Sequence, residues 1–490
     1  MTSVPTGLRR ATLALMTAGS LMVAGAAIAQ ASFGALDSSS EARVSFSGTE
    51  RGKPIQAGGE VAVSGQGFRP GQQVTLLYGS SAIEGGALTA DAEGKVAGKF
   101  TVPANAVSGN HPIVVVAQAP YYATVSDLKI SPTIPLSGQK NYIVTEAQAA
   151  RGLYQSAYSA KNNTLFVTSA VGRPPVHQSE LVKLDADSLK VLARVTPQTA
   201  PERERPAGPA PAAAPGRPGA PGGAEAPQGP GVFAVYGVDV DDAKGTVWVT
   251  NTRQNTVAVY RQSDLSLVKQ FEPGAVGHPR DARVDSALGK AYVSASGKPE
   301  VAVFDTGSLT AAKTIPIRAL GRGKEFSAAR LSLDTAAHKL YVVSLSTGEV
   351  AVIDTRTDAV EKVIPVPGVR SAIGVSHDPQ TGRIFVAAQG SDNLVVLDGT
   401  SGKVIADTPI GAGALNVAFD PVKRRAYVSN RGAGTIAVTD ADGKLLANLG
   451  PAPSANHVAL GKNGTVFAVD KSANARDAES DTIIRIRPKG

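Results

Sequence analysis

The chain has 490 residues, with 49 Lys and Arg, 41 Asp and Glu and no Cys. It is too long for one ordinary domain, and the lack of cysteine excludes a disulfide scaffold, a thiolate metal site and a cysteine nucleophile. With 52 Gly, 32 Pro and 42% hydrophobic residues, the composition favours a turn-rich β fold with a real core. The net charge of +8 permits anionic partners without requiring nucleic acid.

A secretory signal peptide is predicted at residues 1–29. Arg9 and Arg10 precede an uncharged apolar run that ends in a small-x-small pattern at Ala29. An uncleaved membrane anchor is the alternative, because the run spans 19 residues (29 − 10). We expect cleavage near Ala29, which lowers the net charge from +8 to +6 by removing two arginines. The mature chain is then expected to be periplasmic and to contain no transmembrane segment.

A small β domain is predicted to follow a flexible leader at residues 30–42. Over residues 43–132, short segments of alternating or continuous apolar character are separated by Gly-rich turns. This pattern predicts a β-sandwich. The turn from Gly65 to Val74 resembles that of bacterial immunoglobulin-like modules, and this resemblance implies a spacer or adhesion module without chemistry of its own.

The chain from residue 141 to residue 490 is built of repeats. In each repeat an aromatic residue follows a small or apolar one, and the spacings between successive aromatics are 82, 44, 49, 44, 42 and 40. Five copies carry an Asp seven residues before the aromatic, and a second strand usually ends in Asp. Each unit therefore holds about four short strands, which is typical of a propeller blade. The seven aromatics are Phe166, Trp248, Tyr292, Tyr341, Phe385, Tyr427 and Phe467.

Two further features complete the predicted seven-bladed β-propeller. The last repeat supplies three strands, and an unassigned strand at residues 141–145 precedes the first repeat. We expect that strand to be the outer edge of the last blade, so that the ring closes. Residues 198–231 interrupt the repeats, and Pro, Gly and Ala fill 23 of the 30 positions in 201–230. Such a segment predicts a disordered loop, with a Pro-rich docking site as the alternative.

The repeats resemble the YVTN type, most closely at residues 247–251 and 426–430. The stretch 141–488 is similar to the YncE-like exported seven-bladed propellers. That resemblance implies a soluble periplasmic propeller without an established catalytic activity. Some members are associated with DNA binding, and a link to metal or siderophore uptake has been suggested for relatives. The N-terminal sandwich and the Pro/Gly/Ala-rich insertion depart from the family's pattern.

Loops at one end of the predicted ring carry cations interleaved with aromatics. Propellers usually bind ligands at such an end of the central channel, and cations with aromatics suit flat anions. Acidic residues in the same loops favour the alternative of a mixed, solvated surface. The candidate ligand-binding residues are Arg151, Tyr154, Tyr236, Arg253, Arg280, Phe326, Arg330, Arg370, Arg431, Lys471 and Arg476.

No catalytic residue, metal site or cofactor is expected from the sequence. The six His show no metal-ligand spacing, and the repeated Asp residues at strand ends are expected to make Asx turns. We therefore expect a monomeric, non-catalytic binding or scaffold protein. Its ligand would be an anion such as single-stranded DNA or a metal- or siderophore-related molecule, and an envelope protein is a further candidate partner. The alternative is a metal-dependent propeller hydrolase such as a lactonase, with channel-facing acids around the metal.

Overall fold

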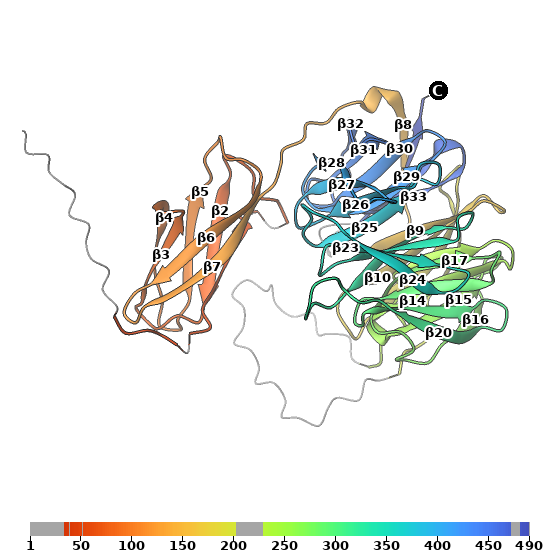
Figure 1. Ribbon diagram of the computed structural model, residues 1–490. Coiled ribbons are helices and arrows are strands. Elements are labelled where there is room, and N and C mark those ends of the chain that lie inside the picture. The colour runs from red at the N-terminus through yellow and green to blue at the C-terminus, as the bar shows by residue number, and fades with distance from the viewer. Residues whose placement is uncertain (1–33, 39, 51, 202–228, 472–480, 490) are drawn as a thin grey trace, which may run out of the picture.

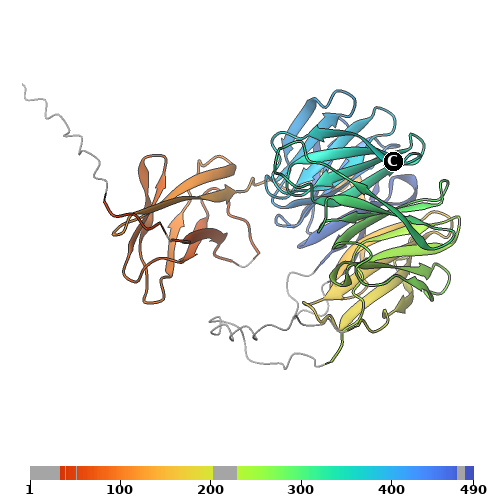
Figure 2. The same ribbon diagram turned by 60° about the horizontal axis from the view of Figure 1, so that its bottom comes forward.

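The computed structural model describes residues 34–38, 40–50, 52–201, 229–471 and 481–489. The predicted signal peptide, most of the predicted insertion and Arg476 lie outside these residues. The described chain forms two bodies, a β-sandwich and a β-propeller (Figure 1). Turning the molecule leaves the sandwich beside the ring (Figure 2).

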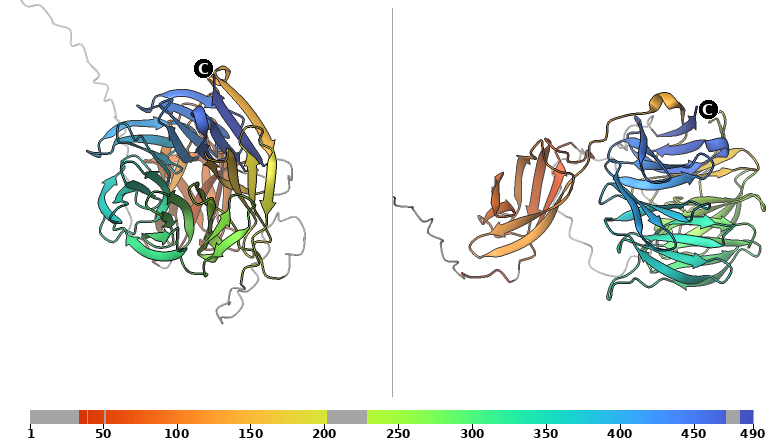
Figure 3. Two further views of the ribbon diagram at one scale, coloured as in Figure 1. Left: turned by 90° about the vertical axis from the view of Figure 1, so that its right-hand side faces the viewer. Right: turned by 45° about the horizontal axis from the view of Figure 1, so that its top comes forward.

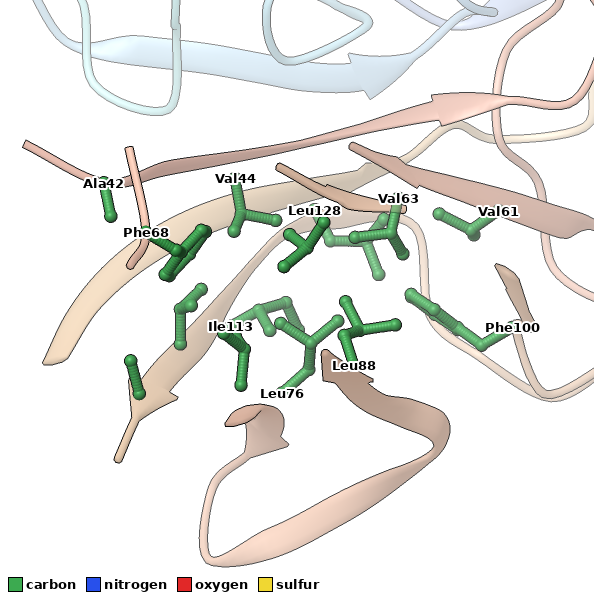
Figure 4. Packing of buried hydrophobic residues seen from close by; sticks show 14 of the residues in the cluster. Ala42, Val44, Val61, Val63, Phe68, Leu76, Leu88, Phe100, Ile113 and Leu128 are labelled. Atoms are coloured by element: carbon green, nitrogen blue, oxygen red, sulfur yellow. The ribbon is translucent and has the colours of Figure 1, made fainter. Parts of the chain in front are cut away.

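The sandwich consists of two antiparallel sheets. Alternate side chains of each strand face the space between the sheets, where Val61, Val63, Ile113 and Val115 are fully or almost fully buried (Figure 4). One sheet has the order β1 (Arg43–Gly48), β2 (Glu60–Gln66), β5 (Val96–Thr101). The other has the order β4 (Ser81–Thr89), β3 (Gln73–Tyr78), β6 (Gly109–Ala117), β7 (Tyr122–Ile130).

Seven four-stranded antiparallel sheets, numbered here as blades 1 to 7, follow in the described residues. Blade 1 consists of β9 (Leu153–Ser159), β10 (Thr164–Val171), β11 (Gln178–Asp185) and β12 (Val191–Val195). Blade 2 consists of β13 (Val238–Asp241), β14 (Thr246–Asn251), β15 (Thr256–Arg261) and β16 (Leu267–Gln270). Blade 3 consists of β17 (Pro279–Asp285), β18 (Lys290–Ala295), β19 (Glu300–Asp305) and β20 (Thr310–Pro316). Blade 4 consists of β21 (Ala328–Asp334), β22 (Lys339–Ser344), β23 (Glu349–Asp354) and β24 (Ala359–Pro365). Blade 5 consists of β25 (Ala372–His377), β26 (Arg383–Ala388), β27 (Asn393–Asp398) and β28 (Val404–Pro409). Blade 6 consists of β29 (Ala414–Asp420), β30 (Arg425–Asn430), β31 (Thr435–Asp440) and β32 (Leu445–Leu449). Blade 7 is β33 (Ala455–Leu460), β34 (Val466–Asp470), β35 (Thr482–Pro488) and β8 (Tyr142–Gln148).

The ring closes through blade 7, as predicted. Strand β8 pairs with β35 along its whole length, from Tyr142 opposite Pro488 to Gln148 opposite Thr482. The first strand of each blade contacts the first strand of the next, and β33 contacts β9 to complete the cycle. The left view of Figure 3 looks onto this ring, with the sandwich behind it.

The repeated residues have the structural roles that their spacing indicates. The aromatics are buried between neighbouring blades, with Tyr341 the most exposed of them at 8%. The strand-end Asp residues accept backbone N–H groups of the following turn, as in Asp420 Oδ1 with Val422 N at 2.8 Å. Asp285 and Asp334 do the same with N–H groups three residues on. The expected Asx turns are therefore confirmed.

Short 3-10 helices are the only helices of the described chain: η1 (Gln139–Asn141), η2 (Thr252–Gln254) and η3 (Lys462–Gly464). Within that part of the chain, no helix has the length and apolar character needed to cross a membrane. The two ends of the predicted insertion pair with each other, because Thr199 bridges Val232 and Ala200 N donates to Gly231 O at 2.8 Å.

The sandwich is fastened to blade 5. The buried carboxylate of Asp392 accepts hydrogen bonds from Lys129 Nζ at 2.8 Å, Ser131 Oγ at 2.6 Å and Gly413 N at 2.7 Å. Arg370 also pairs with Asp127 of β7. The linker that follows lies along β32, where Ser137 and Asn448 exchange backbone hydrogen bonds. One carboxylate thus ties the linker end of the sandwich to two loops of the ring.

Candidate ligand-binding site

Two layers of residues lie at corresponding positions of the seven inner strands. In each inner strand, the reference position is the one that corresponds to Asp285, the last residue of β17 in blade 3. The fifth residue before it defines the mouth layer, where the chain enters the ring. The fourth defines the polar layer, one residue further in. The mouth layer is Tyr154, Tyr236, Arg280, Ala329, Ile373, Leu415 and Asn456, and the polar layer is Gln155, Gly237, Asp281, Arg330, Gly374, Asn416 and His457.

The polar layer ties the blades to one another. An inner strand has no partner strand on its channel side, so half of its backbone N–H groups need other acceptors. Asp281 Oδ2 accepts from Leu331 N at 3.0 Å, and Asn416 Oδ1 accepts from Val458 N at 2.9 Å. His457 Nδ1 accepts from Ser156 N at 3.3 Å. Each of these side chains therefore bonds the next blade around the ring.

The glycines of the polar layer allow close approach of the next blade. A Cβ on Gly237 would lie 2.8 Å from Arg280 O, and one on Gly374 would lie 2.8 Å from Asn416 Cα. Without a side chain at Gly237, the amide of Gln155 reaches past blade 2 and donates to Arg280 O at 3.1 Å. Some blades thus contribute a side chain to the polar layer, whereas blades 2 and 5 contribute only a glycine.

The mouth layer is aromatic and cationic on one side only. The rings of Tyr154 and Tyr236 meet edge to face with centroids 4.6 Å apart, and Lys471 Nζ lies 3.4 Å from the centroid of Tyr154. Burial raises the pKa of Tyr236, and the nearby Arg253 guanidinium partly offsets that effect. Burial also lowers the pKa of Arg280 and of Lys471. Blades 7, 1, 2 and 3 thus gather cations around a tyrosine pair.

Buried charges continue below this mouth. Asp281 Oδ1 lies 3.3 Å from Arg283 NH1 and 3.8 Å from Arg330 NH1. Burial raises the pKa of Asp239 to about 6, although Arg283 acts against that shift. Burial lowers the pKa of Arg330 to about 10, although Asp281 acts to raise it. Three arginines (Arg280, Arg283 and Arg330) therefore face two carboxylates, one of which holds its proton up to weakly acidic pH.

The structure brings five of the predicted residues together at this mouth and places others elsewhere. Phe326, which was predicted as a ligand contact, lies away from the mouth, with its ring 1% exposed in the core between blades 3 and 4. Arg370 is taken up by Asp127 of the sandwich. The five at the mouth are Tyr154, Tyr236, Arg253, Arg280 and Lys471; Arg330 lies one layer below, Arg431 is exposed on the blade 6 loop, and Arg151 is half-buried before β9.

Several residues in or next to the polar layer were not among the predicted site residues. His457 is buried, and its Nε2 has no hydrogen-bond partner. Asp281 and Arg283 were not singled out at all. These residues come from different blades, so no local spacing unites them. Asp281 and His457 share the same distance from the strand-end position, which was an available signal in the sequence.

A Ser–His–Asp arrangement joins blades 4 and 5. Ser332 Oγ lies 2.8 Å from His377 Nδ1, and His377 Nε2 lies 3.6 Å from Asp334 Oδ2. Burial lowers the pKa of His377, and its ring stacks on Tyr341. Ser376 occupies the same repeat position as Ser332, and it accepts from Phe419 N in the next blade at 3.0 Å. The contact of Ser332 with His377 is therefore one of the recurring links between blades.

No group of three or more acidic or histidine side chains is placed to hold a metal ion among the residues that the structure describes. Neither a family model nor a curated protein matches the chain. Solved structures do match it.

The similar solved structures are β-propellers. Hydrazine synthase of Kuenenia stuttgartiensis is 15% identical with a TM-score of 0.52, covering 70% of this chain and 97% of its own. A streptogramin B lyase is 14% identical with a TM-score of 0.50, covering 71% of this chain and 99% of its own. An inactive virginiamycin B lyase from Staphylococcus aureus, solved with quinupristin, is 11% identical with a TM-score of 0.51, covering 71% and 100%. At these identities the likeness concerns the fold, and the chain from β8 to β35 is a β-propeller.

Proposed function

We propose that this chain is an exported, non-catalytic binding propeller of the YncE-like type, with an immunoglobulin-like module at its N-terminal side. Its ligand is an aromatic or base-bearing anion held at the mouth layer. The observation that carries the proposal is the pair of Tyr154 and Tyr236 with Lys471, Arg253 and Arg280 beside it.

The chemistry of that cluster fits a flat anion. Tyr154 is partly exposed, so it offers a ring for stacking. The Nε atom of Arg253 is buried and has no hydrogen-bond partner, which leaves a donor for an anionic group. Single-stranded DNA and an aromatic, siderophore-related carboxylate both combine a flat ring with negative charge. The sandwich is fastened to blade 5, across the ring from blades 1 and 2, and serves as a spacer.

Binding of two probes tests the proposal. The chain without the predicted signal peptide is titrated with a labelled 12-nucleotide oligothymidylate and with 2,3-dihydroxybenzoate, in low salt and then with added salt. Binding of either probe that weakens in Lys471→Met and Arg253→Gln supports the proposal. Oligothymidylate affinity should also fall steeply as salt rises. Failure of both probes to bind, or binding indifferent to both substitutions, would overturn it.

The metal-dependent hydrolase is the competing function. The lyases among the similar structures are enzymes on the same fold, so the fold itself favours neither function. Stoichiometric metal in the purified protein, together with lactone hydrolysis lost on removing that metal, would establish the hydrolase and exclude a purely binding role.

A further inference from the structure

Buried hydrogen-bond donors without acceptors meet in the polar layer. The side chain of Arg330 is 6% exposed, and its Nε and NH1 atoms have no hydrogen-bond partner. The nearest carboxylate oxygen, Oδ1 of Asp281, lies 3.8 Å from NH1, beyond hydrogen-bond distance. A buried guanidinium left with free donors is costly unless an acceptor occupies the space beside it.

His457 adds another donor of the same kind. Its Nδ1 accepts a hydrogen bond from Ser156 N, so the neutral ring must carry its proton on Nε2. That Nε2 is buried and has no partner. The ring stays neutral because burial, helped by the nearby Arg330 and Arg283, lowers the pKa of His457 well below its ordinary value. Ser156 directly follows Gln155, whose side-chain amide donates to Arg280 O beside Asp281, so hydrogen bonds connect the His457 imidazole to the ion pair of Asp281 with Arg330.

The charges around these donors favour a negative occupant. Asp281 is shared between Arg283 and Arg330 and also accepts from Leu331 N. Asp239, the other carboxyl near Arg283, has its pKa raised to about 6. Arg280 directly precedes Asp281 in the chain. The three arginines Arg280, Arg283 and Arg330 therefore outnumber the two carboxyl groups, those of Asp281 and Asp239, by one. An acceptor-rich anion would complete both the charge balance and the hydrogen bonds.

We propose that Arg330 and His457 form a site for a small oxyanion, either a phosphate-type ion or a carboxylate, below the mouth layer. Gln155 presents an unpartnered Oε1 in the same layer, so an ion that both donates and accepts, such as hydrogen phosphate, suits the site best. Arg280 and Asn456 of the mouth layer directly precede Asp281 and His457, so the site lies one residue below the mouth layer. The site shares no residue with the tyrosine pair, so its failure leaves the mouth proposal intact.

Titration with inorganic phosphate and with acetate tests the site. The probes are added to the chain without the predicted signal peptide, in a zwitterionic buffer free of other oxyanions, and heat of binding is measured. Arg330→Gln should weaken binding by about 10- to 100-fold, the range expected when one charge-assisted bond is lost. Arg318→Gln, an exposed arginine on blade 3, is the matched control and should bind as the unaltered chain does.

Nuclear magnetic resonance of the His457 ring gives a second readout that does not depend on the folding of a variant. Its Nε2–H proton should be visible and should shift when phosphate or acetate saturates the site. Phosphate binding stronger than acetate identifies a phosphate-type ion, and the reverse identifies a carboxylate; both support the site. Absence of binding by both ions, an unshifted Nε2–H, or full binding by Arg330→Gln would overturn it.

Discussion

The two halves of the ring carry different chemistry on the same backbone. In blades 7, 1, 2 and 3 the mouth layer consists of the polar or aromatic residues Asn456, Tyr154, Tyr236 and Arg280, whereas in blades 4 to 6 it consists of the aliphatic residues Ala329, Ile373 and Leu415. The apolar half is also the half that holds the sandwich, through blade 5. In our proposal, one half of the ring binds the ligand while the other half holds the sandwich.

Each half of the ring contains a buried acid whose pKa is shifted, and the shifts compared here have opposite directions. Burial raises the pKa of Asp239 in blade 2 and of Asp470 in blade 7 to about 6. In blade 5, hydrogen bonds from Arg424 and Thr381 outweigh burial and lower the pKa of Asp378. The half proposed for binding thus contains acids whose pKa is raised by burial, and the half that holds the sandwich contains an acid whose pKa is lowered by hydrogen bonds.

The largest effect is expected from adding a side chain at Gly374, in the half of the ring that holds the sandwich. In Gly374→Val, the new Cβ meets Asn416 Cα at 2.8 Å and Val417 N at 3.0 Å, so blades 5 and 6 must separate. We expect a loss of about 3 kcal/mol in the free energy of unfolding, measured by chemical denaturation. Gly34→Val is the control, since its Cβ meets nothing within 4 Å. An unchanged unfolding midpoint would contradict the close approach of the two blades.

A smaller loss is expected on removing the Asp392 carboxylate. Asp392→Ala removes the acceptor of Ser131 and one of the two acceptors of Lys129, whose Nζ also donates to Gln389 O; the loss costs about 2 kcal/mol. The sandwich should then move relative to the ring, and small-angle scattering should give a larger radius of gyration. Asp442→Ala, which removes an exposed partner of Arg383, should leave both quantities nearly unchanged. An equal radius for the Asp392 variant would argue that other contacts fix the sandwich.

The raised pKa of Asp470 should be detectable in the pH dependence of the free energy of unfolding. Its raised pKa means that the folded chain keeps a proton which the unfolded chain has lost between about pH 4 and pH 6. Stability contributed by this group is therefore present below that window and falls as pH rises through it. Asp470→Asn should remove that fall, gaining about 1–2 kcal/mol relative to the unaltered chain between pH 4 and pH 7. Parallel stability curves for the two proteins would refute the raised pKa.

The smallest effect concerns affinity. Tyr154→Leu removes the ring that Lys471 covers and should weaken binding of 2,3-dihydroxybenzoate by about 1 kcal/mol, or roughly fivefold. Leu415→Ala, at the corresponding position of blade 6, should lower stability without altering affinity. A reversal of these two results would place the ligand on the other half of the ring.

The sequence was sufficient to predict the strands, because each repeat combines apolar alternation with a fixed aromatic and a strand-end Asp. It also predicted that β8 completes blade 7, since the last repeat lacked one strand. The site was only partly predictable. Phe326 and Tyr236 both occur in loops that lead to inner strands, and both are buried. Their neighbours differ only in three dimensions, because Phe326 packs in the core between blades 3 and 4 and Tyr236 packs against Tyr154 at the mouth. His457 and Arg330 lie 127 residues apart (457 − 330), so their meeting depends on ring closure.

Amide chemical-shift mapping is the direct test of whether the ligand occupies blades 7, 1, 2 and 3. The deuterated chain without the predicted signal peptide is titrated with 2,3-dihydroxybenzoate, and shifts are assigned to blades. We predict that the largest shifts cluster around Tyr154, Tyr236 and Lys471, with little change in blades 4 to 6. Shifts concentrated on blades 4 to 6 or on the sandwich, or no shifts at saturating ligand, would contradict the claim.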